Sequence, residues 1–282
     1  MPYTSMRELL PIAEKKGYAL GAFNIFNYQT ARAVIEACEE ENAPVIIQTS
    51  AKTAKQLGVV QMMDFLLPLV KKASIPVAVH LDHCTDVALA KACIDAGWSS
   101  IMIDGSHHPL AQNIAMSKEI VAYAKANQVH GEISVEGELG AIVGVEDDIF
   151  VSEDAGALAD VKSSVEYVKA TGIDAFAPAI GTAHGLYSGT PKIDFDRFME
   201  IRKAVDIPLV VHGGTGLSRE VFQKLIKLGA SKINVSTAIK VVYLKTSLEQ
   251  AKQVSDPLKF DAAVLKAVKE EVKTFLNIFS AA

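Results

Sequence analysis

Short apolar runs alternate with amphipathic segments along the whole chain. Eight of the runs are almost continuously hydrophobic, as in PVAVHLDH, which is typical of parallel strands covered on both faces. They cover residues 19–25, 44–50, 76–83, 99–106, 132–140, 174–181, 208–214 and 232–237. The segments between them, such as REVFQKLIKLGA, have helical periodicity, and several end at a glycine suited to a helix C-terminus: Gly97, Gly172 and Gly229.

About eight strand–helix units without a break in composition predict a single α/β domain over residues 1–282, a (β/α)8 TIM barrel. A doubly wound open sheet is the alternative. One connection, residues 141–159, is long, acidic and weakly periodic. Connections of this length often act as lids, so we expect a mobile lid loop here.

Composition and charge exclude several classes of protein. The chain has 282 residues, of which 22% are charged, and a net charge of -5, so it lacks the broad basic surface of a nucleic-acid-binding protein. No apolar run approaches the roughly 18–20 residues that span a membrane, and the N-terminus lacks the apolar core of a signal peptide. Cys38, Cys84 and Cys93 form no C-x-x-C pair, which is typical of a reduced protein. We therefore expect a cytoplasmic protein without membrane or nucleic-acid partners.

Histidines stand where three of the predicted strands end. Because the active site of such a barrel lies at the C-terminal ends of its strands, we expect His83, His184 and His212 to converge there. A lone loop histidine is usually only hydrogen-bonded, but three at matching positions of the repeat favour a metal site with an open fourth position. The other histidines are given lesser roles. His80 packs within a strand or supports a metal ligand, His107 and His108 are exposed in a loop with at most such a supporting role, and His130 lies at the far face.

Carboxylates stand at the same strand ends. Asp82 precedes His83, where a nearby divalent ion would favour its ionised, proton-accepting form. Asp104 and Glu138 end neighbouring strands and could supply a second metal position or orient the metal ligands. Alternatively, they cap the helices that follow.

Glycines follow the seventh predicted strand in HGGTG, and small polar residues end the eighth in INVST. Bare backbone N–H groups at these loops are suited to a phosphate, which barrels often hold there. A metal that polarises a carbonyl beside a phosphate cradle indicates reversible carbon–carbon cleavage of a phosphorylated sugar. Sugar isomerisation and metal-assisted hydrolysis use similar parts and stay open at this point.

Nine motifs in order extend this interpretation: GAFNI, HLDHC, MIDGSHHP, VEGELG, GVEDD, AIGTAHGLY, TPKIDF, LVVHGGTG and KINVST. Over nearly its whole length the chain resembles the class II, metal-dependent ketose-bisphosphate aldolases, and within them the short fructose/tagatose-bisphosphate branch.

The resemblance implies a role for each matching residue. His83, His184 and His212 correspond to the ligands of one Zn²⁺, and Asp104 and Glu138 to an alternative, outward metal position. Asp82 corresponds to the group that exchanges a proton with the C4 hydroxyl, and Glu146, in the lid, to the acid acting at the dihydroxyacetone phosphate carbon. The residues implied to contact the substrate are Asn24, Ser50, Gly185, Gly213, Gly214, Thr215, Asn234, Val235, Ser236 and Thr237. It also implies a monovalent cation, Na⁺ or K⁺, and a homodimer or homotetramer.

One segment departs from the family. Where many relatives have D-P-R, with an arginine that binds the far phosphate, this chain has SDPLKF, with Leu258 in the arginine's place. Leucine forms no charge-assisted bond, and the adjacent Lys259 does not reproduce the bidentate fork. We therefore predict that the aldehyde half lacks phosphate or carries another group. Fructose and tagatose types stay open, as do an isomerase or epimerase and a non-catalytic phosphosugar-binding subunit.

Overall fold

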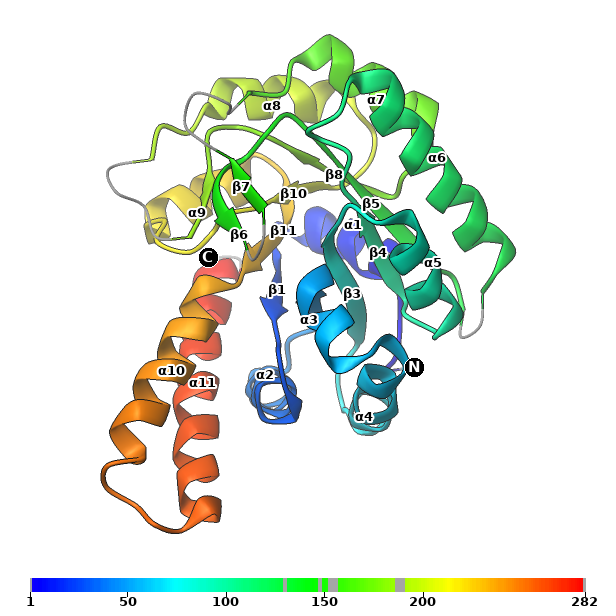
Figure 1. Ribbon diagram of the computed structural model, residues 1–282. Coiled ribbons are helices and arrows are strands. Elements are labelled where there is room, and N and C mark those ends of the chain that lie inside the picture. The colour runs from blue at the N-terminus through cyan, green and yellow to red at the C-terminus, as the bar shows by residue number, and fades with distance from the viewer. Residues whose placement is uncertain (1, 129–130, 147–148, 152–156, 186–190, 281–282) are drawn as a thin grey trace.

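Eight parallel strands close into a barrel, in the order β1-β11-β10-β8-β5-β4-β3-β2 (Figure 1). The computed structural model describes residues 2–128, 131–146, 149–151, 157–185 and 191–280. The barrel strands are β1 (Leu20–Asn24), β2 (Val45–Ser50), β3 (Val77–Cys84), β4 (Ser100–Ile103), β5 (Ser134–Leu139), β8 (Ala175–Pro178), β10 (Leu209–Val211) and β11 (Ala230–Val235). Each overlaps one of the eight predicted runs, so the (β/α)8 barrel is confirmed and the open sheet is wrong.

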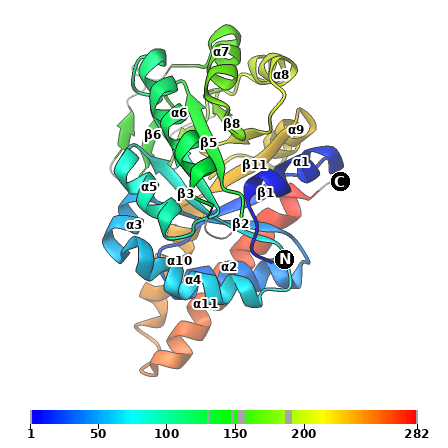
Figure 2. The same ribbon diagram turned by 90° about the vertical axis from the view of Figure 1, so that its right-hand side faces the viewer.

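Helices surround the barrel in Figures 1 and 2. They are α1 (Met6–Lys16), α2 (Tyr28–Glu40), α3 (Ala51–Leu57), α4 (Val59–Lys72), α5 (Val87–Asp95), α6 (Leu110–Ala126), α7 (Val161–Thr171), α8 (Phe195–Ala204), α9 (Arg219–Lys227), α10 (Thr237–Gln250) and α11 (Pro257–Phe279). Local signals set many of their ends: the side chain of Asn27 caps α2, and Gly172, in the left-handed region at φ 68°, ends α7. The three glycines predicted at helix ends all have positive φ.

Helix α1 closes the N-terminal end of the barrel. Its residues Met6, Leu9, Leu10 and Ala13 pack with inward-facing strand residues such as Ala78 in one apolar cluster. The larger cluster, which includes Val77, Val79 and Leu81, lies between the strands and the outer helices. Because apolar side chains fill the N-terminal end, polar groups inside the barrel collect toward the C-terminal ends of the strands.

The long connection at residues 141–159 contains regular structure that its weak periodicity did not predict. Strands β6 (Val143–Glu146) and β7 (Ile149–Val151) form an antiparallel pair, and β6 also pairs in parallel with β9 (Ala183–His184). Residues 147–148 and 152–156 lie outside the described residues. The connection is therefore docked through β6 onto the strand that carries His184.

Two further expectations concern the cysteines and the membrane. Cys38, Cys84 and Cys93 are buried and form no disulfide. Among the helices in the described ranges, none combines the length and apolar character needed to cross a bilayer.

Candidate metal and substrate site

The three predicted histidines converge at the C-terminal end of the barrel. His83 lies in β3, His184 in β9 and His212 directly after β10, and each offers a ring nitrogen within 4.8 Å of the others. The ring of His83 lies 4.8 Å from that of His184 and 4.5 Å from that of His212, centroid to centroid. His83 and His212 are buried, and His184 is partly exposed. Three ligands with an open side fit a catalytic metal site.

An irregularity in β3 brings both Asp82 and His83 to this site. In a regular strand, neighbouring side chains point to opposite faces. Here the β3–β4 register shifts between Leu81 and Cys84, so β3 contains one extra residue, and His83 has a φ of 46°. A bulge re-aims side chains, and a positive φ in a residue other than glycine is a strained conformation found at functional sites.

His83 and His212 each have one ring nitrogen beside a carboxylate and the other facing its neighbour's ring. His83 Nδ1 lies 3.0 Å from Asp104 Oδ2, and His212 Nε2 lies 2.8 Å from Glu136 Oε1, so each of these nitrogens carries the proton. The remaining nitrogens, His83 Nε2 and His212 Nδ1, face each other at 2.7 Å. Burial, followed by the charge of His83, lowers the pKa of His212 to about 3, so the His212 ring is neutral near pH 7.

Two carboxyl groups stand close to these rings. Glu138 Oε2 is 3.5 Å from His212 Nδ1 and 3.9 Å from His83 Nδ1, and it has no hydrogen-bond partner in the part of the chain that the structure describes. Burial and then the charge of Asp104 raise the pKa of Glu138 well above its ordinary value. Burial acts in the same direction on Asp104, but the interactions with His83 and the hydrogen bonds from Ser106 together outweigh it and hold the pKa of Asp104 below its usual range.

This donor set fits a divalent metal ion such as zinc. Imidazole and carboxylate are ordinary zinc ligands, and His83, Asp104 and Glu138 form a second group whose ligand atoms lie within 4.8 Å of one another. The paired carboxylates also orient the rings, as in many zinc proteins. The predicted principal and alternative metal positions therefore share His83.

Asp82 is held by three side-chain amides. Its Oδ2 accepts hydrogen bonds from Gln48 Nε2 at 2.9 Å and Asn24 Nδ2 at 3.3 Å, and its Oδ1 accepts one from Asn234 Nδ2 at 3.1 Å. The side chain is fully buried, and all three donors suit an ionised carboxylate, which only accepts hydrogen bonds. This arrangement fixes a carboxylate directly beside a candidate metal ligand.

The predicted phosphate loops line a single pocket next to His184. Its lining residues are His184, Gly185, Gly213, Gly214, Thr215, Asn234, Ser236, Thr237 and Lys240. Helix α10 begins at Thr237, so the positive end of its dipole lies at the pocket. Lys240, one turn into α10, adds a cation that the sequence pattern had not singled out. Backbone N–H groups, a helix N-terminus and a lysine together suit an anion.

Gly213 is expected to tolerate no side chain. Its φ is 67°, and an added Cβ would lie 2.4 Å from the carbonyl oxygen of Ala183, the neighbour of His184. Gly172 is a matched control, since its φ is 68° but no atom lies within 4 Å of an added Cβ. Gly172→Ala should therefore cost only the left-handed strain, about 1–2 kcal/mol of unfolding free energy, with unchanged KM. Gly213→Ala should lower the Tm further and raise KM; equal effects of the two variants on KM would contradict this.

The sequence analysis did not predict a layer of charged residues that lies beneath the histidines. Glu136 in β5 and Lys232 in β11 are fully buried, with Lys232 Nζ 2.9 Å from Glu136 Oε2. His80, which was predicted to pack within its strand, is buried beside them, 3.8 Å from the same oxygen. The available signal was a charged residue at an inward-facing position of an apolar strand.

The other predicted residues have more varied positions. Ser50 is buried, and its Oγ caps α3 by accepting a hydrogen bond from the Thr53 N–H. Val235 is fully buried in the outer apolar cluster rather than in the pocket lining. Glu146 is the last residue of β6. The remaining histidines divide as follows: His107 is exposed, His108 is partly buried against it, and His130 lies outside the described residues.

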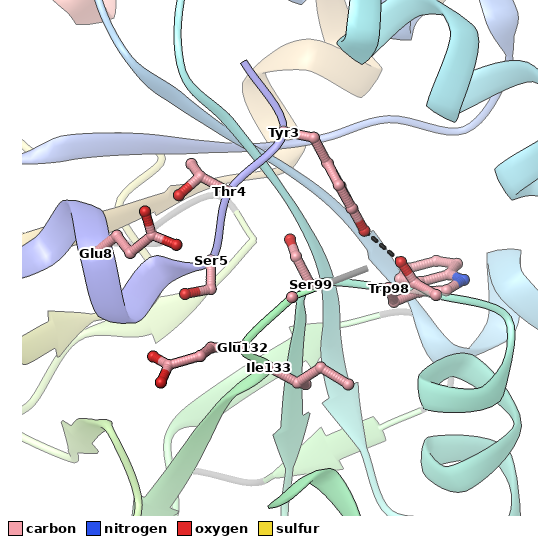
Figure 3. Close-up of a pocket in the computed structure, with 10 residues that line it drawn as sticks. Tyr3, Thr4, Ser5, Glu8, Trp98, Ser99, Glu132 and Ile133 are labelled. Atoms are coloured by element: carbon pink, nitrogen blue, oxygen red, sulfur yellow. Dashed lines mark hydrogen bonds between the residues drawn. The ribbon is translucent and has the colours of Figure 1, made fainter. Parts of the chain in front are cut away.

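A separate cavity of about 120 Å³ lies at the opposite end of the barrel (Figure 3). Its lining includes Tyr3, Ser5, Trp98 and Ile133, and the Tyr3 hydroxyl donates a hydrogen bond to the carbonyl of Gly97. Trp98 and Ile133 lie just before the starts of β4 and β5, and Tyr3 and Ser5 lie before α1. Because chemistry in such barrels takes place at the C-terminal ends of the strands, this cavity is not the catalytic site.

Comparison with known proteins decides the family. A family model described as "Fructose-bisphosphate aldolase class-II" matches residues 4–282. The chain belongs to the class II fructose-bisphosphate aldolase family. The fructose-bisphosphate aldolases of Staphylococcus aureus and Staphylococcus epidermidis are 42% and 41% identical to it over 286 residues, covering 99% of this chain and 98% of each relative.

Solved structures agree with this family membership. The YdjI aldolase of Escherichia coli K12 superposes with a TM-score of 0.87 at 29% identity, covering 99% of this chain and 97% of that one. A Coccidioides immitis protein assigned as a fructose-1,6-bisphosphate aldolase superposes with a TM-score of 0.90 at 30% identity, covering 96% and 94%. The chain is thus a class II aldolase, a carbon–carbon lyase whose substrate is a small phosphorylated sugar.

Proposed function

We propose that this aldolase uses one Zn²⁺ to cleave a ketose 1-phosphate or 1,6-bisphosphate reversibly into dihydroxyacetone phosphate and an aldehyde. The observation that supports this most strongly is the convergence of His83 Nε2 and His212 Nδ1, 2.7 Å apart, with a ring nitrogen of His184 within 4.8 Å of both residues' ligand atoms. Three imidazoles at this spacing suit a divalent cation. When bound, the metal would polarise the ketose carbonyl.

The residues around this position divide the proton transfers. Asp82 takes the proton of the C4 hydroxyl, the C3–C4 bond breaks, and its electron pair stays with the three-carbon phosphate fragment. Glu146 then returns a proton to that carbon from the connection at residues 141–159, which closes over the site as a lid. In support, β6 ends at Glu146 and pairs through Gly144 with His184.

The phosphate of the three-carbon fragment binds in the glycine-lined pocket. Gly213 and Gly214 leave the backbone bare, because an added Cβ at either would lie within 2.6 Å of a carbonyl oxygen. Lys240 supplies a charge-assisted contact, which is stronger than a neutral hydrogen bond.

The aldehyde end is the part in which this chain differs from many relatives. Leu258, in the position of their arginine, is 78% exposed at the start of α11. The start of α11 lies at the tip of the α10–α11 pair, which projects from the barrel (Figures 1 and 2). We therefore infer that the aldehyde half is held without the usual arginine–phosphate pair.

A panel of ketose 1-phosphates and 1,6-bisphosphates of the fructose and tagatose series, assayed for dihydroxyacetone phosphate in Na⁺ or K⁺ buffer, tests this function. We expect the product to form, with similar kcat/KM for fructose 1-phosphate and fructose 1,6-bisphosphate. A strong preference for the bisphosphate would contradict the inference from Leu258. Ketose consumption without dihydroxyacetone phosphate would instead indicate an isomerase or epimerase, and no turnover a binding subunit.

The α10–α11 pair also supports a homo-oligomer. Val241, Leu244 and Leu248 of α10 are 47%, 65% and 63% exposed, and their spacing places them along one face of the helix. Contiguous exposed apolar side chains mark protein–protein contacts. We propose that this face forms the interface of a homodimer, alone or within a homotetramer.

Replacing Leu244 with glutamate should therefore dissociate the oligomer. A charge in an apolar interface loses its solvation without gaining a partner, so sedimentation velocity should show a shift to monomer at micromolar concentration. Val60→Glu is the matched control, because Val60 is an apolar residue that is 56% exposed on a different helix, α4. A parent protein that sediments as a monomer, or a dimer unaffected by Leu244→Glu, would contradict the proposal.

A further inference from the structure

A buried ion pair spans the barrel interior beneath the proposed metal position. Lys232 Nζ lies 2.9 Å from Glu136 Oε2 and 3.2 Å from Glu136 Oε1, and both side chains are fully buried. Lys232 belongs to β11 and Glu136 to β5, which are separated in the barrel by β10 and β8. The contact therefore crosses the barrel instead of joining neighbouring strands.

The same carboxylate holds a metal ligand. Glu136 Oε1 lies 2.8 Å from His212 Nε2 and also faces Lys232 Nζ. On the other side, His80 Nε2 is 3.8 Å from Glu136 Oε2, while His80 Nδ1 contacts the Ser100 hydroxyl at 2.7 Å. Lys232 and His212 thus meet on one carboxylate deep in the barrel.

We propose that Lys232 is a positioning residue for the metal site. Its ammonium, 2.9 Å from Glu136 Oε2, keeps Glu136 in the orientation that accepts a hydrogen bond from His212 Nε2. That bond fixes the tautomer in which the Nδ1 lone pair of His212 faces the metal position. The inference rests on the proposed zinc site. It extends that site to Lys232, which would act on the metal only through Glu136 and His212.

Stability alone does not explain this pair. Burying two charges removes their hydration, and apolar residues of similar volume often stabilise a protein as well or better. Barrel interiors are usually filled by Val, Ile and Leu. We explain a lysine and a glutamate at this depth by the orientation that they give to His212. Without Lys232, the buried carboxylate of Glu136 would no longer be fixed in the position that accepts the hydrogen bond from His212.

The test measures metal binding rather than turnover. The full chain is stripped with a chelator and titrated with Co²⁺, whose visible absorption reports the ligand geometry. Lys232→Met should weaken Co²⁺ binding about 10- to 100-fold, the usual effect of removing an outer partner of a ligand. Lys269→Met is the matched control, because it breaks an ion pair between α11 and α2, with Lys269 Nζ 3.1 Å from Glu36, and should leave Co²⁺ binding unchanged.

The double variant Glu136→Gln/Lys232→Met separates positioning from folding. It removes both charges, so its Tm should recover toward that of the parent, while Co²⁺ binding stays at least about tenfold weaker. Parent-like affinity in Lys232→Met, or affinity that returns together with the Tm in the double variant, would overturn the role of Lys232. A parent chain that binds no Co²⁺ would instead overturn the proposed metal site.

Discussion

Replacing Asp82 with alanine is expected to lower kcat about 10²- to 10⁴-fold while zinc stays bound. General acid–base groups contribute rate factors of this order, and the C4 hydroxyl would lose its proton acceptor. The proposed ligand nitrogens belong to His83, His184 and His212, so the metal site would keep its donors. The measurement is kcat for ketose phosphate cleavage together with zinc content per chain.

Gln48→Met is the matched comparison for Asp82. Gln48 Nε2 donates to Asp82 Oδ2 at 2.9 Å and to Asn24 Oδ1 at 2.7 Å, so its loss disturbs the carboxylate without removing it. Its effect on kcat should be smaller, about tenfold, because a hydrogen bond to a charged group is worth ~1.5–3 kcal/mol and the amides of Asn24 and Asn234 still hold the carboxylate. An Asp82→Ala enzyme that keeps more than about a tenth of its activity would remove Asp82 from the mechanism.

Replacing His212 with alanine is expected to lose both zinc and activity. One ring nitrogen is a proposed ligand, and the other is bound to Glu136. A bound metal stabilises transition-state charge by several kcal/mol, which at about 1.4 kcal/mol per tenfold gives a loss of at least ~100-fold. His212→Ala and Asp82→Ala should therefore both be slow but differ in zinc content.

His107→Ala provides the control for histidine removal. His107 is exposed in the loop before α6 and contacts the ring of His108, outside both groups of candidate metal ligands. Its replacement should leave zinc content and kcat unchanged. Full zinc occupancy in His212→Ala would show that the metal is held elsewhere.

The barrel could be predicted from the sequence because each strand carries its own signal. Residues 76–83 are almost continuously apolar, and in the structure Val77, Val79 and Leu81 pack against the outer helices while Ala78 faces the interior. Strands covered on both faces keep this pattern wherever they lie in the barrel. The convergence of the histidines followed from the fold, because the C-terminal ends of parallel strands meet at one end.

Other features depend on tertiary geometry that a linear pattern does not contain. A strand pattern gives Asp82 and His83 opposite faces, and only the extra residue in β3 and the positive φ of His83 bring both to the site. The pairing of β6 with β9 likewise joins segments about 40 residues apart, since Val143 pairs with Ala183. Long-range pairing of such short strands leaves little local signal.

The interior ion pair is a feature that the sequence pattern could have predicted only in part. Lys232 and Asn234 alternate with Ile233 and Val235, which face the outer cluster, so the polar residues face inward. That alternation could have marked Lys232 as an interior charge. Its partner could not be named, because Glu136 lies 96 positions away on a strand that is not adjacent.

Release of dihydroxyacetone phosphate by one enzyme preparation, before chelation, after chelation and after addition of Zn²⁺, tests the metal-dependent cleavage most directly. We expect product with the purified protein, a loss of at least ~100-fold after the metal is stripped, and recovery when about one Zn²⁺ per chain is restored. A stripped protein, shown to hold no divalent metal, that still releases dihydroxyacetone phosphate at the original rate would contradict the proposed site.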